Sequence, residues 1–325
     1  MNYRSFGRAG WQVSELGMGC AALGGGVYQK NDREAIATLR EALDAGINFF
    51  DTASSYSAGH SERLIGLAFK GRRDRVIIAS KVGMFYPPAV RLASRFKYLL
   101  IPVRALLGPI APSLNRIKYA HKYGNFSPRR ITESVHGSLK RLGTDYIDLY
   151  QLHNPPPDGL AHDDLCEPLE QLKRQGKIRE YGISCKETSA APLALRHSIA
   201  SVQVIFNLLD QEALTQCLPL AGERNVAVIA RLPFAQGLLT DARETKADRI
   251  ATDSAKVAPR RERAARFRFL ATDQRTMAQA ALRFVLQTPG VSVALAGMST
   301  RGHLQENLGA LSAQPLSGEE LVRCR

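Results

Sequence analysis

The sequence predicts an α/β protein with the (β/α)8 TIM-barrel architecture, an N-terminal β-hairpin and long strand-to-helix loops. Short apolar runs alternate with longer segments of helical periodicity, and this unit occurs eight times. Several helical segments stop at a glycine, as at Gly46, Gly71 and Gly143. A chain of 325 residues with 45% hydrophobic content is long enough for one such barrel, so we expect residues 1–325 to form a single domain.

The expected elements follow one another in a regular order. A hairpin over residues 2–16, with GRAG as its turn, leads into a first strand near Leu16–Gly19. The later strands are predicted from the runs INFF, VIIAS, YIDLYQL, IREYGIS, SVQVIF, VAVIA and VSVALA. The helices are predicted over residues 31–45, 61–70, 127–142, 163–175, 189–197, 208–222, 273–287 and 302–311.

Two segments interrupt this alternation, residues 84–126 and residues 238–262, and both are too long for ordinary connections. Each follows a strand and precedes a helix, so we expect both at the carboxyl ends of the strands, as walls of a pocket. The first is a basic insertion that mixes aliphatic and aromatic residues with Arg, Lys and repeated prolines. We interpret it as a lid over an apolar or anionic substrate. The alternatives are a basic patch that contacts a membrane surface or a partner, and a disordered segment.

The net charge of +14 is concentrated in a few regions. Between Asp74 and Glu133 the chain has eleven lysines and arginines and no acidic residue. A second basic run, residues 256–268, is typical of a solvated helix face. Because no zinc-finger or aromatic-interleaved pattern accompanies these charges, we expect no nucleic-acid partner.

Cysteine usage and hydropathy bear on the compartment. The five cysteines are scattered without paired or metal-ligand spacing, so we expect neither disulfides nor a bound metal. The N-terminus is polar, and no stretch reaches the roughly 18 to 20 apolar residues that a membrane-spanning helix needs. These features predict a soluble, cytoplasmic protein with no transmembrane segment. The sequence carries no signal for the oligomeric state.

Four polar residues lie at or just after the ends of three apolar runs. Asp51 closes INFFD with Tyr56 five residues further on, Lys81 closes VIIASK, and His153 ends YIDLYQLH. The carboxyl ends of parallel barrel strands share one rim, so these positions are expected to converge. Taken singly, each residue is also typical of a structural role, such as a turn cap or a loop contact. Their convergence is what predicts a site.

Six motifs carry a resemblance to a known family. They are FFDTASSYSAGHSERLIG, VIIASKVG, SLKRLGTDYIDLYQLHNP, GISC, VQVIFNLLDQ and AGMSTRGHLQENL. In this order and spacing they resemble the aldo-keto reductase superfamily across nearly the whole chain. The resemblance implies an NADP-dependent oxidoreductase that interconverts an aldehyde, ketone or sugar carbonyl and its alcohol. It places the family's catalytic tetrad on Asp51, Tyr56, Lys81 and His153.

The chemistry explains why these residue types belong together. Hydride delivery to a carbonyl carbon leaves negative charge on oxygen, so a proton donor is needed beside that oxygen. Tyr56 suits this role if the ammonium of Lys81 lowers the pKa of its phenol, and Asp51 would keep that ammonium charged. His153 is expected to donate to the substrate oxygen, to orient it or to assist a proton relay.

The hydride must come from a cofactor. By resemblance, Ser184 and Gln203 would hold the nicotinamide carboxamide. The residues expected along the pyrophosphate and nicotinamide are Arg231, Leu232, Phe234, Gln236 and Gly237, and those expected around the adenosine are Gly297, Ser299, Thr300, Arg301, Gln305 and Asn307. Because the Arg301 guanidinium favours a 2′-phosphate over a hydroxyl, NADPH/NADP+ is preferred, with NADH as the alternative.

The chain departs from the family pattern at three positions near the expected cofactor. Cys185 replaces an asparagine, Arg231 replaces an aromatic residue, and His303 stands where many relatives have an arginine. A second function class also stays open, because potassium-channel β subunits share the resemblance: a nucleotide-sensing regulatory subunit with incidental turnover. Neither the substrate nor the physiological direction is indicated by a motif.

Overall fold

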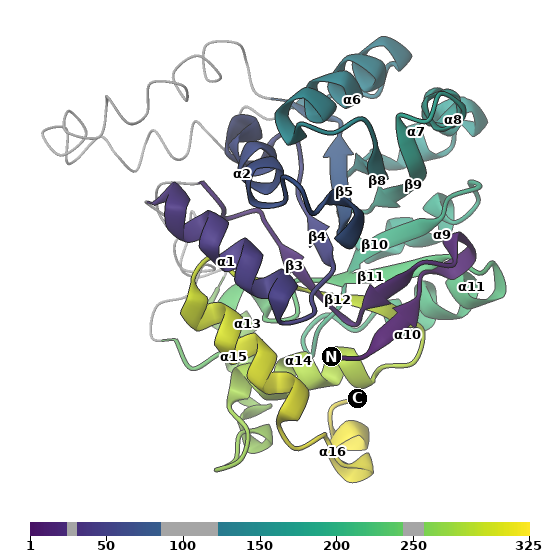
Figure 1. Cartoon of the computed structure of the whole chain (residues 1–325). Coiled ribbons are helices and arrows are strands. Elements are labelled where there is room, and N and C mark those ends of the chain that lie inside the picture. The colour runs from purple at the N-terminus through teal and green to yellow at the C-terminus, as the bar shows by residue number, and fades with distance from the viewer. Residues whose placement is uncertain (25–30, 86–122, 243–256) are drawn as a thin grey trace, which may run out of the picture.

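A closed barrel of eight parallel strands forms the centre of the molecule (Figure 1). The computed structural model describes residues 1–24, 31–85, 123–242 and 257–325. Every neighbouring pair of strands is parallel, in the order β10-β11-β12-β3-β4-β5-β8-β9 and back to β10. The strands are β3 (Leu16–Gly19), β4 (Phe49–Asp51), β5 (Ile77–Val82), β8 (Ile147–His153), β9 (Ile178–Ser184), β10 (Ser201–Ile205), β11 (Ala227–Arg231) and β12 (Val291–Gly297). The predicted fold class is confirmed.

Helices surround the barrel on its outer side (Figure 1). In the described ranges they are α1 (Asp32–Asp44), α2 (His60–Ala68), α6 (Pro128–Leu142), α7 (Pro157–Leu160), α8 (Glu167–Arg174), α9 (Ala191–Ala194), α10 (Ala213–Gln216), α11 (Leu218–Glu223), α13 (Ala258–Ala265), α14 (Met277–Gln287), α15 (Arg301–Ser312) and α16 (Gly318–Arg323). That all 325 residues form one domain stays a prediction.

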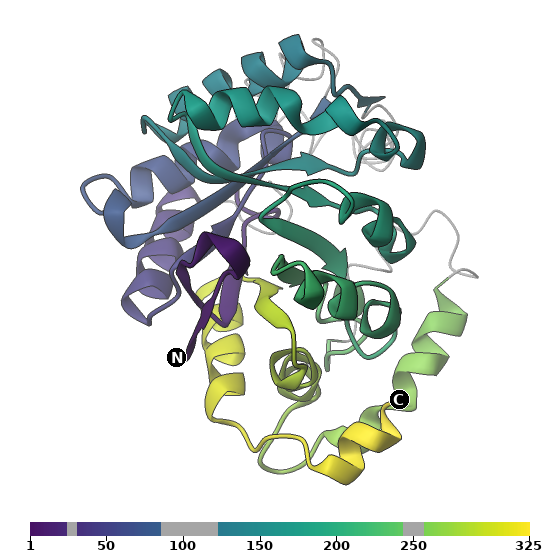
Figure 2. The same cartoon turned by 90° about the vertical axis from the view of Figure 1, so that its right-hand side faces the viewer.

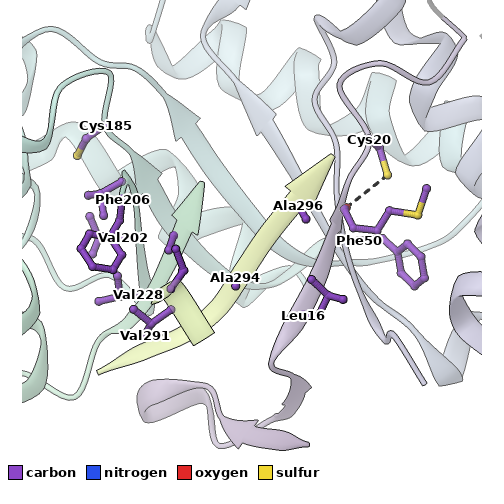
Figure 3. Close-up of a cluster of buried hydrophobic side chains, with 14 of the residues drawn as sticks. Leu16, Cys20, Phe50, Cys185, Val202, Phe206, Val228, Val291, Ala294 and Ala296 are labelled. Atoms are coloured by element: carbon purple, nitrogen blue, oxygen red, sulfur yellow. Dashed lines mark hydrogen bonds between the residues drawn. The ribbon is translucent and has the colours of Figure 1, made fainter. Parts of the chain in front are cut away.

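Alternate residues of the strands point to opposite sides of the barrel wall. Phe50 packs towards the helices, with its ring 4.5 Å from that of Phe69. Phe49 belongs to a second cluster, which it shares with Leu149 and Ile229 of other strands. Figure 3 shows part of the larger cluster, in which strand residues such as Phe50 lie among other buried apolar side chains.

The N-terminal hairpin covers one end of the barrel (Figure 2). Its strands are β1 (Tyr3–Ser5) and β2 (Gln12–Ser14), as the sequence predicts. Phe6 is fully buried in the cluster that contains Phe49, and its ring stacks 5.6 Å from Trp11. Because apolar side chains fill this end, the carboxyl ends of the strands are left to build a site.

Several predicted helix boundaries are wrong. The helix expected over 208–222 begins only at Ala213, because the Asn207 side-chain oxygen accepts from the backbone N–H of Leu209 and Asp210 and holds a turn there. It is also divided into two short helices at Cys217, whose φ of −125° and ψ of −54° are not helical. The helix expected over 273–287 begins only at Met277, after a Thr276 capping box.

Three further boundaries differ from the sequence prediction. Residues 163–175 form a 3-10 turn, Asp163–Cys166, followed by α8. The segment 189–197 is helical only over Thr188–Ala190 and α9. The C-terminal helix α16, which the sequence reading omitted, begins at a Ser317 capping box.

The ends of the basic insertion lie beside the barrel. Met84–Phe85 (β6) pairs antiparallel with Tyr123–Gly124 (β7). Residues 86–122 of the predicted insertion at 84–126 lie outside the described residues, so the lid, surface-patch and disorder interpretations stay predictions. The start of α6 at Pro128 and its stop at Gly143 (φ 65°) agree with the sequence.

Candidate active site

The four predicted residues lie on one rim of the barrel. Asp51 is the last residue of β4, Lys81 is the penultimate residue of β5, and His153 is the last residue of β8. Tyr56 begins the 3-10 turn that follows β4, Tyr56–Gly59. Since β4, β5 and β8 are consecutive parallel neighbours, their carboxyl ends lie side by side. The convergence that the sequence predicts is therefore present.

Lys81 and Asp51 form an ion pair inside the barrel. Lys81 is fully buried and Asp51 is 2% exposed. The Lys81 ammonium donates to Asp51 Oδ1 and to the carbonyl oxygen of Thr52, the latter at 2.9 Å. Asp51 Oδ2 accepts from the side-chain amides of Gln151 at 3.2 Å and Gln203 at 2.9 Å. Both buried charges are thus compensated.

The Tyr56 hydroxyl lies against this ion pair. Lys81 Nζ donates to the Tyr56 hydroxyl oxygen at 3.3 Å, and it lies 4.9 Å from the centroid of the tyrosine ring. The ring of His153 meets that of Tyr56 edge-on, with centroids 5.9 Å apart and planes at 85°. Ser57 and Ala58, which follow, have φ values of 48° and 56°, a left-handed conformation that side chains disfavour. Such strain is typical of functional sites.

Burial and charge act in opposite directions on the two proton-carrying groups. Burial raises the pKa of the Tyr56 phenol, and the adjacent Lys81 ammonium lowers it by a smaller amount, so the net shift is upward. The expected lowering of the Tyr56 pKa is therefore outweighed in this structure. Burial on its own would lower the pKa of Lys81, but attraction to Asp51 and Tyr56 raises it overall. Lys81 thus stays a cation.

Ser184 and Gln203, the predicted carboxamide residues, lie next to the ion pair. Ser184 Oγ donates to Gln203 Oε1 at 3.0 Å, and Gln203 Nε2 donates to Asp51. The hydroxyl keeps its lone pairs and the amide keeps one N–H, so both side chains can make further hydrogen bonds. Cys185 beside them is 1% exposed, and burial raises the pKa of its thiol to about 12.

Arg231 ends β11 and reaches across to the segment after β9. Its Nη2 donates to the carbonyl oxygens of Cys185 at 2.8 Å and Lys186 at 3.0 Å. Its Nε is buried with no hydrogen-bond partner in the parts of the chain that the structure describes. Burial lowers the pKa of Arg231, although Tyr56 and Asp51 oppose that shift. A cation therefore stands at the position where the family pattern has an aromatic ring.

The segment after β11 turns sharply. Leu232 and Gln236 have φ values of 59° and 62°, and Gly237 has φ 100°. The side-chain amide of Asn207 donates to the Leu232 carbonyl at 3.0 Å and so fixes the first of these turns. Phe234 is partly buried against the core. The predicted pyrophosphate residues are thus gathered in one turn at the rim.

The predicted adenosine residues lie around the start of α15. Thr300 caps this helix, and its side chain accepts from the His303 backbone N–H at 3.2 Å. Ser299 Oγ and His303 Nδ1 are 3.1 Å apart, so that histidine is bonded to the cap segment. The side-chain amide of Asn307 donates to the Gly297 carbonyl at 3.4 Å.

Arg301 and Gln305 are both bonded to one carboxylate, that of Glu41 in α1. Arg301 Nε forms an ion pair with Glu41 Oε2 at 3.0 Å. Gln305 Nε2 donates to Glu41 Oε1 at 2.8 Å. The guanidinium that the sequence assigns to a phosphate is therefore paired with an acidic residue.

Sequence reasoning missed two rim residues, Gln151 and Asn154, and one helix residue, Glu41. Gln151 lies two residues before His153, so the period-two pattern of β8 carries a signal for it. Asn154 has φ 57° and a buried side-chain oxygen with no hydrogen-bond partner within the described ranges. Glu41 has no local signal, because its partners are about 260 positions away in the sequence.

Comparison with known proteins agrees with this geometry. A family model described as the aldo/keto reductase family matches residues 15–325. The chain belongs to the aldo/keto reductase family. The resemblance predicted from its motifs is confirmed, and the family is one of oxidoreductases.

Relatives and solved structures of this family cover nearly the whole chain. The uncharacterized oxidoreductase YqkF of Bacillus subtilis (strain 168) is 31% identical over 99% of this chain and 94% of that protein. The aldo-keto reductase AKR11C1 from Bacillus halodurans, in its holo form, has a TM-score of 0.78 at 30% identity and covers 100% of this chain and 95% of that one. An aldo/keto reductase from Klebsiella pneumoniae, in complex with NADP and acetate, has a TM-score of 0.68 at 25% identity and covers 100% of this chain and 94% of that one.

The described residues provide neither a cluster of metal ligands nor a membrane-spanning helix. They contain no group of three or more His, Cys, Asp or Glu side chains arranged to hold a metal ion. Among the helices of the described ranges, none is long and apolar enough to cross a membrane. All five cysteines are free and buried.

Proposed function

We propose that this protein is an NADP(H)-dependent carbonyl reductase in which Tyr56 is the general acid and base. The observation that carries the proposal is the buried Lys81–Asp51 ion pair, which holds an ammonium against the Tyr56 hydroxyl. Its substrate class is a small carbonyl compound, an aldehyde, ketone or sugar, with the corresponding alcohol as the product.

The residues present fit a nicotinamide nucleotide. Ser184 and Gln203 have hydrogen-bonding capacity to spare beside the tetrad, and the buried Nε of Arg231 lacks a partner among the described residues. The turn after β11 and the start of α15 lie on the two last strand-to-helix connections, where barrels commonly bind phosphate groups. The Klebsiella pneumoniae relative is a structure with NADP, which supports the same cofactor here.

A bound reduced nicotinamide supplies hydride to the carbonyl carbon. The side chains of this protein manage the charge that then develops on the carbonyl oxygen. The Tyr56 O–H bond breaks as the proton passes to that oxygen, which becomes the alcohol hydroxyl. The phenolate that remains is stabilised by the Lys81 ammonium 3.3 Å away. Asp51 keeps that ammonium charged throughout.

His153 has a different part in this scheme. Its ring stands edge-on to the ring of Tyr56, with centroids 5.9 Å apart. From there it can donate to the carbonyl oxygen and orient it for proton transfer from Tyr56. In the reverse direction the phenolate accepts the alcohol proton, so the same residues serve oxidation.

The experiment is a steady-state assay of purified protein with a panel of aldehydes, ketones and sugars, using NADPH and NADH in parallel. We expect carbonyl-dependent oxidation of the nucleotide with at least one member of the panel. Tight nucleotide binding with negligible turnover on every carbonyl would instead support the nucleotide-sensing class and contradict the reductase. Tyr146→Phe is a matched control for variants of Tyr56, because Tyr146 precedes β8 and lies at its opposite end from His153.

A further inference from the structure

We propose that Glu41 sets the nucleotide preference of this enzyme by competing with the 2′-phosphate for Arg301, so that NADH is accepted beside NADPH. The inference rests on the proposed function, because it concerns the adenosine end of the same nucleotide site. Glu41 lies in the last turn of α1, outside every motif that carries the family resemblance.

The contacts that carry the inference link two helices that lie side by side (Figure 1). Arg301 is the first residue of α15 and Gln305 stands one helical turn later, so both point from the same face. The carboxylate of Glu41 binds them with separate oxygens, at 3.0 Å to Arg301 Nε and 2.8 Å to Gln305 Nε2. Both oxygens of the carboxylate are thus directed at the side chains expected to meet adenosine.

The local charge balance follows from these contacts. Glu41 cancels the charge of Arg301, and His303, the nearby position where relatives often have an arginine, is bonded through Nδ1 to Ser299. A 2′-phosphate carries a charge of about −1.5 to −2, so it would approach an already neutralised guanidinium and a carboxylate of its own sign. A 2′-hydroxyl has no such repulsion and can donate to a carboxylate.

The solvent exposure of the Arg301 and Glu41 side chains determines how strongly Glu41 repels the 2′-phosphate. The side chain of Arg301 is 64% exposed and that of Glu41 is 34% exposed, so the pair is accessible and can exchange partners. Solvent and salt screen the repulsion at this surface. Removing the carboxylate charge is therefore expected to tighten NADP+ binding by about three- to tenfold relative to NAD+.

The test is equilibrium binding of NADP+ and NAD+ to the full-length protein by isothermal titration calorimetry, which needs no turnover. The variants are Glu41→Gln, which keeps the side-chain shape, and Arg301→Ala, which removes the cation. Asp44→Asn is the matched control, because it removes one negative charge from the same helix at a residue that pairs with Arg72 instead. Thermal melts of each variant report whether folding is intact.

We expect Glu41→Gln to raise the affinity ratio of NADP+ over NAD+ by about three- to tenfold at low salt, and by less at 0.5 M salt. Asp44→Asn should leave the ratio within twofold, and Arg301→Ala should lower it. An unchanged or lowered ratio in Glu41→Gln, with both nucleotides still bound, would overturn the inference and leave the proposed function standing. Failure of the unaltered protein to bind either nucleotide would overturn both.

Discussion

The Asp51→Asn substitution tests the buried ion pair through protein stability. Asparagine keeps the shape of the side chain but removes the charge that faces the Lys81 ammonium. Lys81 is fully buried, so the substitution leaves either an uncompensated cation or a lysine that must lose its proton. The less costly of these two states sets the penalty, which is the loss in the free energy of unfolding.

The penalty has an upper limit that depends on pH. Deprotonating a lysine whose ordinary pKa is 10.5 costs about 5 kcal/mol at pH 7 and about 2 kcal/mol at pH 9. Breaking a buried pair by removing one partner costs about 3 to 5 kcal/mol, which lies within that limit at pH 7. For 325 residues, this corresponds to a melting temperature lower by about 4 to 7 °C near neutral pH.

The free energy of unfolding depends on pH with opposite sign in the unaltered protein and in the Asp51→Asn variant. In the unaltered protein the pKa of Lys81 is raised, so its contribution to stability is full below pH 10.5 and is lost as pH rises through the folded-state value. In Asp51→Asn, burial acts without a counter-charge and lowers the pKa of Lys81. The variant therefore gains stability as pH rises from its lowered pKa towards 10.5.

The assay is urea unfolding of both proteins at pH 7, 8 and 9, with Asp44→Asn as an exposed control. We expect the free-energy difference between the unaltered protein and Asp51→Asn to shrink by about 1 to 3 kcal/mol across this range, since a penalty of about 3 to 5 kcal/mol at pH 7 meets a limit of about 2 kcal/mol at pH 9. The control should show a small, flat difference. A penalty below about 1 kcal/mol at pH 7, or one that does not change with pH, would refute the reasoning.

Three further predictions concern other parts of the molecule. Lys81→Met removes the ammonium that opposes burial, so the pKa of Tyr56 should rise further and alcohol oxidation should need a more alkaline pH; an unmoved pH profile would count against this role. Gly66→Ala places a Cβ about 2.2 Å from the Leu142 carbonyl oxygen, so the free energy of unfolding in urea should fall by about 1 to 3 kcal/mol. An unchanged free energy of unfolding would be inconsistent with this close packing. Arg275→Met removes a 2%-exposed side chain that donates to the segment before α16, so amide hydrogen exchange in α16 should accelerate, whereas equal protection would argue against that anchoring.

The barrel was predictable because its signals are local. Each strand is a short apolar run, and helix stops such as Gly143 lie where the backbone needs a left-handed residue. The late start of the helix predicted over 208–222 also has a local cause. The Asn207 side chain is hydrogen-bonded within its own turn, and apolar periodicity does not report such a bond. Hydrogen bonds of this kind compete with helix formation.

The candidate site was predictable only in part. Strand ends and family motifs identified Tyr56 and Lys81, since both depend on position along the chain. The net shift in the Tyr56 pKa could not be predicted from the sequence, because it depends on how deeply the hydroxyl is buried. The pairing of Arg301 with Glu41 joins two helices that are remote in sequence, so only the folded structure reveals it.

The most direct test of the central claim is a single-turnover measurement on Tyr56→Phe. Protein saturated with NADPH is mixed with a carbonyl substrate of the unaltered enzyme, and oxidation of the bound nucleotide is followed by absorbance. We predict that the variant binds NADPH as tightly as the unaltered protein and Tyr146→Phe do, but oxidises it at least about a hundredfold more slowly. A rate within a few-fold of the unaltered protein would show that Tyr56 is not the proton donor.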